Sequence, residues 1–135
     1  MSMATLNPDD VELLTGKNFA HFAAIRPDGT PHVTVIWIDA ADGYILVNTA
    51  VGRVKDRHVR RDPRVSVSVH DEQDQYRWLR VDGIVAEFVT GPEADAHIDA
   101  LNRRYHDGEA WTYTPGQERV IYRVRPQRIL RRYDG

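Results

Sequence analysis

The sequence predicts a mainly β protein with short helices, in which about six or seven mostly antiparallel strands form a small closed or partly closed barrel. Strict alternation of valines with Ser66, Ser68 and His70 in the segment 64–70 is typical of a strand with one buried face. Turn sequences at 27–30 and 42–43 separate strands that follow one another closely, and the helical patterns are short and lie between strands.

The first elements follow from local signals. Asn7 followed by Pro8 and two aspartates is typical of a helix start, and this helix is expected to end near Gly16. Apolar β-compatible segments at 19–26, 32–39 and 44–49 are joined by turns, so we expect three consecutive strands in an antiparallel meander.

The middle of the chain changes from strand to helix and back. Residues 52–61 show helical spacing of apolar side chains before Asp62-Pro63 ends the helix. The strand 64–70 is followed by a polar turn and a long strand at 76–89, in which the apolar phase switches at Gly83. This glycine is therefore predicted to mark a bulge or a sharp bend.

The last third contains one more helix and two strands. Pro92 begins a helix with an apolar face of Ala94, Ile98, Leu101 and Tyr105, and a loop at 106–116 follows. Residues 117–125 alternate as a strand, and Pro126 is expected to separate it from a final strand at 129–133.

Size and composition limit the possible functions. A chain of 135 residues is expected to form a single domain over 1–135, and a deep ligand cavity inside one protomer would compete with its core. The 18 basic and 20 acidic residues leave a net charge of −2, which gives no overall attraction to nucleic acid or to an anionic membrane. Without cysteine, thiol chemistry is excluded. The beginning of the sequence lacks a signal-peptide pattern and no apolar run could span a membrane, so we expect a cytoplasmic location.

The segment 47–58 carries the most chemical information. A strand brings Thr49 to the first turn of a helix, where free backbone N–H groups favour an anion, and Arg53 and Lys55 lie beside it. A hydroxyl, a guanidinium and an ammonium group there could bind a phosphate. The alternative is a solvated basic helix whose charges pair with Asp56 and Asp62.

Several segments in order resemble one known family. They are Val47-Asn48-Thr49, the run at 52–66 that begins Gly52-Arg53-Val54-Lys55-Asp56, the segment 29–37 that ends Val35-Ile36-Trp37, and Trp78-Leu79-Arg80-Val81-Asp82-Gly83. Together they resemble the pyridoxamine 5′-phosphate oxidase-like split β-barrel proteins, which bind flavin or deazaflavin. The similarity is greatest to the small actinobacterial branch that uses coenzyme F420, and it covers nearly the whole chain.

The resemblance implies a homodimer with a cofactor in each of two grooves between the protomers. It implies a phosphate site at Thr49, Arg53 and Lys55 with Asn48 beside it. It also implies that the cofactor ring lies along the strand 33–37 and that the segment Trp78-Leu79 reaches in from the partner protomer. The implied cofactor-binding residues are Val33, Val35, Ile36, Trp37, Asn48, Thr49, Arg53, Lys55, Trp78 and Leu79. The substrate-phosphate residues of the oxidases are not recognisable near the C-terminus, which argues against pyridoxamine phosphate as the substrate.

The resulting hypothesis is an F420-dependent oxidoreductase that transfers a hydride between the reduced deazaflavin and a small unsaturated or conjugated substrate. The cofactor would carry the redox chemistry, and no catalytic side chain is identified. The alternatives are an FMN-dependent oxidase or reductase, and a non-catalytic cofactor-binding or haem-binding barrel. Nucleic-acid binding is disfavoured because Asp56 and Asp62 interrupt the basic segment.

The remaining candidate residues have structural as well as functional interpretations. The histidines are scattered, so no metal site is expected. Trp37 and Trp78 could line a cofactor ring or pack in the core, and Trp111 with Tyr113 could cap a pocket, although plugging the barrel end is favoured. The C-terminal arginines are interpreted as a solvated face, with binding of the acidic tail of the deazaflavin as the alternative. They are Arg123, Arg125, Arg128, Arg131 and Arg132.

Overall fold

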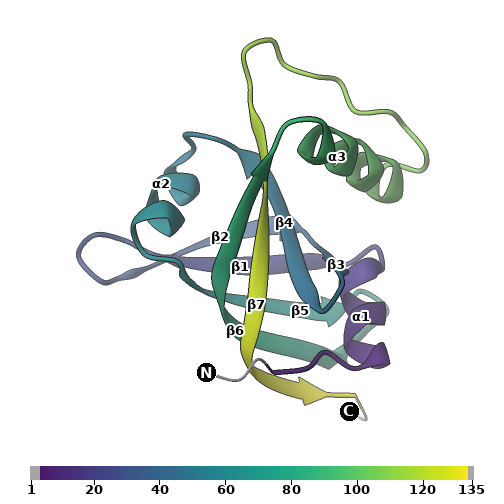
Figure 1. The fold of residues 1–135 in the computed structure, drawn as a ribbon. Coiled ribbons are helices and arrows are strands. Elements are labelled where there is room, and N and C mark those ends of the chain that lie inside the picture. Colours follow the sequence, from purple (N-terminus) through teal and green to yellow (C-terminus); the bar gives the residue numbers. More distant parts are fainter. Residues whose placement is uncertain (1–3, 134–135) are drawn as a thin grey trace.

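The computed structural model describes residues 4–133, which contain one seven-stranded sheet and three helices (Figure 1). In chain order the elements are α1 (Pro8–Thr15), β1 (Phe19–Ile25), β2 (Pro31–Trp37), β3 (Asp39–Ala41), β4 (Tyr44–Ala50), α2 (Val54–Arg61), β5 (Arg64–Asp71), β6 (Asp74–Thr90), α3 (Pro92–Tyr105) and β7 (Arg119–Arg132). The predicted fold class, mainly β with short helices, is confirmed.

The strands pair in the order β2-β1-β5-β6-β7-β4-β3, and every pairing is antiparallel. Strands β2 and β3 stand at opposite ends of this order, yet only Ile38 separates them along the chain. The sheet must therefore curl until its two edges come close together, and the result is a barrel that stays split between them (Figure 1).

The predicted three-stranded meander is wrong in its second half. Strands β1 and β2 form the expected hairpin, but β2 ends at Trp37, and β4 pairs with β3 and β7 instead of β2. The short strand β3 was not predicted. The chain passes from one edge of the sheet to the other at Ile38, which is fully buried, and periodicity along one segment does not report that change of partner.

A bulge at Gly83 interrupts the pairing of the long strands β6 and β7. The register between them shifts between Asp82 and Gly83, which confirms the predicted bulge, and a Cβ atom at Gly83 would lie 2.6 Å from the carbonyl oxygen of Arg125. The predicted break at Pro126 is wrong, because β7 continues through it. Pro126 pairs with Gly83 at the bulge, where a strand tolerates a residue that has no N–H group to donate.

The core fills the inside of the curled sheet. Phe22, Ile45 and Tyr122 are fully buried there, and α1 adds Leu13 and Leu14, which are also fully buried. Helix α1 begins as predicted: Asn7 and Asp10 form a capping box in which each side chain accepts from the other's backbone N–H. This apolar interior makes the barrel a rigid support for side chains at its rim.

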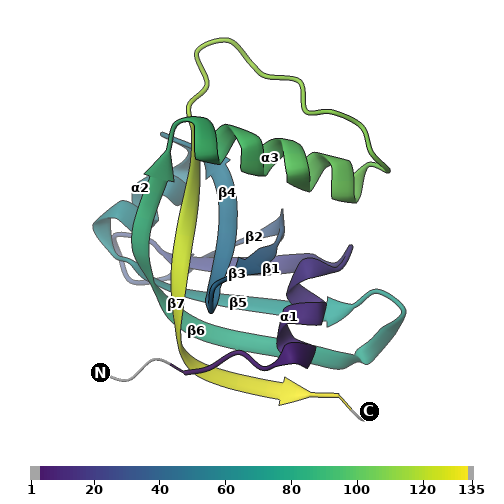
Figure 2. The ribbon, with the colours of Figure 1, turned by 45° about the vertical axis from the view of Figure 1, so that its right-hand side comes forward.

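Helix α3 lies across one end of the barrel, near the ends of β4, β6 and β7 (Figure 2). Its predicted apolar face is confirmed, because Ala94, Ile98, Leu101 and Tyr105 are all buried. The chain then forms a long segment outside α3 before it enters β7 (Figure 2). Within residues 4–133, no helix is both long and apolar enough to cross a membrane.

Candidate functional site

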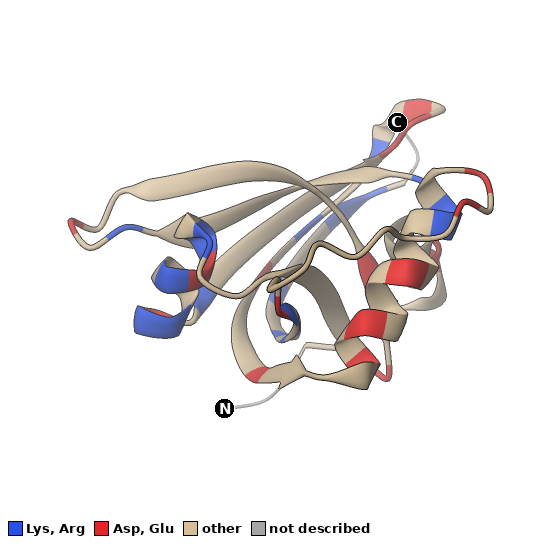
Figure 3. Ribbon diagram, turned by 90° about the horizontal axis from the view of Figure 1, so that it is seen from above, with Lys and Arg blue, Asp and Glu red and all other residues tan. Residues whose placement is uncertain are grey.

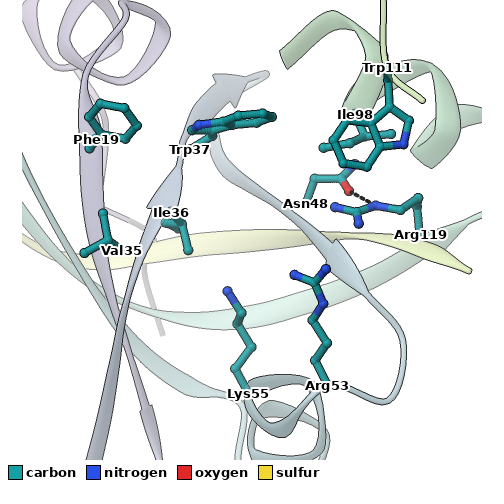
Figure 4. Close-up of a pocket in the computed structure, with 10 residues that line it drawn as sticks. All are labelled: Phe19, Val35, Ile36, Trp37, Asn48, Arg53, Lys55, Ile98, Trp111 and Arg119. Atoms are coloured by element: carbon teal, nitrogen blue, oxygen red, sulfur yellow. Dashed lines mark hydrogen bonds between the residues drawn. The ribbon is translucent and has the colours of Figure 1, made fainter. Parts of the chain in front are cut away.

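A pocket of about 290 Å³ opens at the rim of the barrel, between β2, the start of α2 and helix α3 (Figure 4). One part of its wall is cationic and the other is apolar and aromatic. The lining residues are Phe19, Val35, Ile36, Trp37, Asn48, Arg53, Lys55, Ile98, Trp111 and Arg119.

Arg53 and Lys55 reach the pocket from the beginning of α2 (Figure 4). The chain turns into this helix at Gly52, which has a positive φ of 91° that side chains with a Cβ atom rarely adopt. The N–H of Gly52 donates to Oδ2 of the buried Asp56 at 2.9 Å, and the same oxygen accepts from Nε of Arg60 at 2.9 Å. Asp56 therefore holds the turn that presents the two cationic side chains.

Arg119, at the start of β7, adds a third cation that the sequence analysis did not identify. Its Nε donates to Oδ1 of Asn48 at 3.0 Å, and its Nη1 donates to Oε1 of Gln117 at 3.0 Å. The guanidinium carbon lies 5.2 Å from the ring centroid of Trp111. The residue is only 4% exposed, so its guanidinium is held in one position.

The three cations are close enough to perturb one another. Burial, together with the charges of Arg53 and Arg119, lowers the pKa of Lys55 to about 8. Burial and the charge of Arg53 lower the pKa of Arg119 to about 10. Within residues 4–133, no carboxylate forms an ion pair with Arg53, Lys55 or Arg119. An anionic ligand would relieve this repulsion, so the geometry favours a phosphate or carboxylate group.

The aromatic wall is formed around Trp37. Its ring stacks on Tyr105 with centroids 5.1 Å apart and planes inclined by 8°, and the ring of Trp111 meets it edge-on at 6.5 Å. The Nε1 of Trp111 is buried without a hydrogen-bond partner. Trp111 lines the pocket, as the capping alternative expects, and it also packs against the apolar face of α3 at the barrel end.

A second, larger recess of about 540 Å³ adjoins the first and shares Val35, Arg53 and Lys55 with it. His32 and Thr34, on the face of β2 that looks toward α2, line this recess. The Nδ1 atom of His32 and the Oγ1 atom of Thr34 are buried without a partner. The cations Arg53 and Lys55 on its wall favour an anionic group in this recess.

Six of the predicted site residues line the first pocket, namely Val35, Ile36, Trp37, Asn48, Arg53 and Lys55. The other four lie elsewhere. Val33 is exposed on the edge strand β2, and Thr49 points into the core with its Oγ1 unpartnered. Trp78 and Leu79 lie on β6, where Leu79 belongs to the barrel core and Trp78 is half-buried. The roles of these four residues stay predictions.

Four lining residues were missed as site residues or left open: Phe19, Ile98, Trp111 and Arg119. Ile98 was assigned only to the buried face of its helix, and it lies in that cluster against Trp37 and Trp111. The sequence offers only a weak signal for Arg119: it is an arginine in a predicted strand, and the neighbouring positions on the same face of that strand hold no carboxylate.

Charge is unevenly distributed over the molecule. Basic side chains gather on α2, whereas α3 carries, ahead of the arginines in its last turn, the acidic residues Glu93, Asp95 and Asp99 (Figure 3). Arg131 is exposed, as the interpretation of the C-terminal arginines as a solvated face expects, but it also forms two hydrogen bonds of 3.0 and 2.7 Å with the fully buried Asp10. Nη1 of Arg123 lies 3.7 Å from Oε1 of Glu87, and its Nη2 lies 3.7 Å from Oε2 of Glu93.

In residues 4–133, no three side chains of the metal-binding types come close enough together to hold a metal ion. The pocket offers cations for an acidic group, and flat aromatic and aliphatic surfaces for a ring. The groups lie at the open edge of the barrel, so a ligand could reach them without unfolding of the sheet.

Comparison with known proteins identifies the family. The pyridoxamine 5′-phosphate oxidase family matches residues 4–133. The chain belongs to this family. A solved structure called F420 reductase is 35% identical, with a TM-score of 0.79, over 92% of this chain and 98% of its own. No curated protein matches the chain.

Two further structures share the family's fold. A conserved hypothetical protein from Mycobacterium tuberculosis is 26% identical, with a TM-score of 0.76, over 97% of this chain and 86% of its own. The General Stress Protein 26 from Bacillus anthracis is 17% identical, with a TM-score of 0.67, over 92% and 91% of the two chains. The second similarity bears on the fold alone. Membership of this family and the F420 reductase neighbour support a flavin or deazaflavin cofactor and an oxidoreductase-like function.

Proposed function

We propose that this protein binds coenzyme F420 in the pocket and transfers a hydride between the reduced deazaflavin and a small unsaturated or conjugated substrate. The observation that carries the proposal is the convergence of Arg53, Lys55 and Arg119, without carboxylate partners among residues 4–133, opposite the stacked ring of Trp37. The 35% identity to a protein called F420 reductase supports the deazaflavin as the cofactor.

The residues present fit a cofactor that has a phosphate group and a flat ring. Arg53 and Lys55 would hold the phosphate beside the first turn of α2, where the backbone N–H groups favour an anion. Val35, Ile36 and Trp37 would support the ring along β2. Thr49 would belong to the phosphate site only through its backbone at the end of β4, because its side chain points into the core.

The bound cofactor would supply the hydride chemistry. The protein would hold the ring in one orientation and exclude water from one side of it with Trp37 and Trp111. The pKa of Lys55 is lowered to about 8 in the free protein. A bound anion would offset the repulsion from Arg53 and Arg119, so Lys55 would then hold its proton more firmly.

We further propose that the site is shared by two copies of the chain in the cytoplasm. Strand β2 is an edge of the sheet, and Val33 and Val35 on it are 56% and 64% exposed. Apolar side chains on an unpaired edge strand invite a second protein surface. In this arrangement Val33 would face the groove, and Trp78 would reach the cofactor of the partner protomer, while Leu79 would anchor that segment in the core of its own barrel.

An FMN-dependent reaction is the alternative within the same family. Anaerobic titration of the protein with F420 and, separately, with FMN distinguishes the two, with tryptophan fluorescence as the readout because Trp37 and Trp111 line the pocket. We expect tight, saturable quenching by F420. Tight binding of FMN with no response to F420 would overturn the deazaflavin assignment. Hydride transfer from the cofactor that binds is then measured with a panel of conjugated acceptors.

A further inference from the structure

A chain of hydrogen bonds leads from helix α3 to the pocket. Nη2 of Arg104 donates to Oδ1 of Asp39 at 2.9 Å, and Nε2 of His97 lies 2.9 Å from Oδ2 of the same carboxylate. On the other side of the ring, Nδ1 of His97 lies 3.1 Å from Nδ2 of Asn48. Oδ1 of Asn48 then accepts from Nε of Arg119 at 3.0 Å, as Figure 4 shows.

The donors and acceptors in this chain determine the tautomer of His97. A guanidinium can only donate, so the amide oxygen of Asn48 must face Arg119, and its NH₂ group must face away. That NH₂ group donates to the carbonyl oxygen of Ala94 at 3.0 Å, which leaves its second hydrogen for Nδ1 of His97. Nδ1 therefore accepts, and the ring proton is on Nε2, where it is donated to Asp39.

Asp39 is suited to accept the hydrogen bond from Nε2 of His97. Its burial favours the neutral acid, but hydrogen bonds from His97 and Arg104 outweigh this effect and hold its pKa below the ordinary value. The carboxylate and the imidazole are both largely buried, with side chains 15% and 12% exposed. The arrangement is thus shielded from water, and each member has a single orientation that satisfies all of its neighbours.

The same series of hydrogen bonds explains how Arg119 keeps a positive charge that no carboxylate among residues 4–133 neutralises. Its two side-chain acceptors, on Asn48 and Gln117, are neutral amides. A carboxylate at either position would hold the guanidinium equally well and would cancel the charge that an anionic ligand needs. Asn48 can play this part only while its amide is prevented from rotating by 180°. The carbonyl oxygen of Ala94 and Nδ1 of His97, which both accept from its NH₂ group, supply that constraint together.

We propose that His97 is a positioning residue: as the neutral, Nε2-protonated tautomer it fixes the amide of Asn48, which aims the guanidinium of Arg119 into the pocket. The inference rests on the proposed function, because it takes the pocket as the cofactor site. His97 belongs to α3 and does not line the pocket itself, so its effect on a ligand passes through Asn48 and Arg119.

The tautomer is measured first, in the cofactor-free protein. Long-range proton–nitrogen correlation spectra of ¹⁵N-histidine protein distinguish a protonated ring nitrogen from a free one. We expect His97 to show a protonated Nε2 and an unprotonated Nδ1. A protonated Nδ1 would overturn the proposal, because the amide of Asn48 would then have to turn its NH₂ group toward Arg119.

The coupling to Arg119 is measured as a double-mutant cycle for F420 binding, with FMN titrated in parallel. His97→Leu is expected to weaken binding about tenfold, as loss of one well-placed charged hydrogen bond would. Arg119→Ala should weaken it by at least as much, and His97→Leu should add nothing in the Arg119→Ala background. His97→Gln, whose amide offers one donor and one acceptor, is the matched variant and should stay within about threefold of wild type.

The outcomes separate this inference from the function on which it rests. Additive losses in the cycle would mean that His97 acts independently of Arg119, which overturns the inference. If Arg53→Ala with Lys55→Ala abolishes binding but Arg119→Ala does not, the inference alone fails. A wild-type protein that binds neither cofactor overturns the proposed function and the inference with it. Thermal unfolding of each variant is recorded, and His97→Phe, which keeps a ring, replaces His97→Leu if the latter does not fold.

Discussion

The hydroxyl of Tyr122 donates a hydrogen bond of 2.7 Å to Oδ1 of Asp56, and both side chains are buried. This bond joins the core of the sheet to the helix that carries Arg53 and Lys55. Burial and the hydrogen bond to Asp56 raise the pKa of the Tyr122 hydroxyl, so it remains a donor at every pH at which the protein would work.

Removal of this hydroxyl tests how much the link contributes. Tyr122→Phe leaves one oxygen of the buried Asp56 without its donor, and we expect the free energy of unfolding in urea to fall by about 1–3 kcal/mol. Tyr44→Phe is the matched control, because its ring is partly exposed and its hydroxyl bonds to no residue in 4–133. An equal loss in both variants would contradict a specific role for the bond.

The cationic wall of the pocket is tested by charge removal. Arg53→Ala combined with Lys55→Ala should weaken cofactor binding by about 3 kcal/mol, or roughly 100-fold, through loss of charge-assisted bonds to phosphate. Arg57→Ala, an exposed position on the same helix, should change the affinity little. Fluorescence titration of the three proteins checks this, and an unchanged affinity in the double variant would place the phosphate site elsewhere.

The affinity for the cofactor should depend on pH through Lys55. In the free protein its pKa is about 8, and a bound anion raises that value, so binding takes up a proton in the range above pH 8. The dissociation constant should therefore be constant below about pH 7 and should increase by up to tenfold per pH unit above about pH 8.

The matched variant for this pH dependence is Lys55→Arg, whose side chain stays charged across the range. Its dissociation constant should be nearly flat from pH 7 to pH 9, because Arg119 has a pKa of about 10 and keeps its proton there. A wild-type affinity that does not change between pH 7 and pH 9.5 would refute the assignment to Lys55.

Substitutions of two neighbouring C-terminal arginines, Arg131 and Arg132, should differ sharply in their effect on the free energy of unfolding. Arg131 pairs with Asp10, which also accepts from Tyr133 and caps α1, so Arg131→Gln leaves a buried carboxylate without its cation. We expect a loss of about 3 kcal/mol in the free energy of unfolding. Arg132→Gln, at the exposed neighbouring position, should cost less than about 0.5 kcal/mol, and equal effects would disprove the distinction.

Much of the fold could be predicted because its signals are local. Alternation of valines and serines in β5, the capping box at Asn7 and the bulge at Gly83 each depend on a few neighbouring residues. The cationic pair of Arg53 and Lys55 could be predicted for the same reason, since Arg53 immediately precedes α2 and Lys55 lies in its first turn. The family resemblance contributed the remaining site residues on β2 and β4.

The tertiary structure alone decided which strands pair and which distant side chains meet. Whether β2 pairs with β4 or the chain crosses at Ile38 depends on closure of the whole sheet, which no short segment encodes. Arg119 and Arg123 share one face of β7, yet Arg119 enters the pocket and Arg123 lies near Glu87 and Glu93. The difference arises because Asn48, far away in sequence, stands beside Arg119, whereas Arg123 meets the carboxylates of β6 and α3. By itself, therefore, the sequence determined most of the elements and two of the three cations of the site, whereas long-range packing supplied the third.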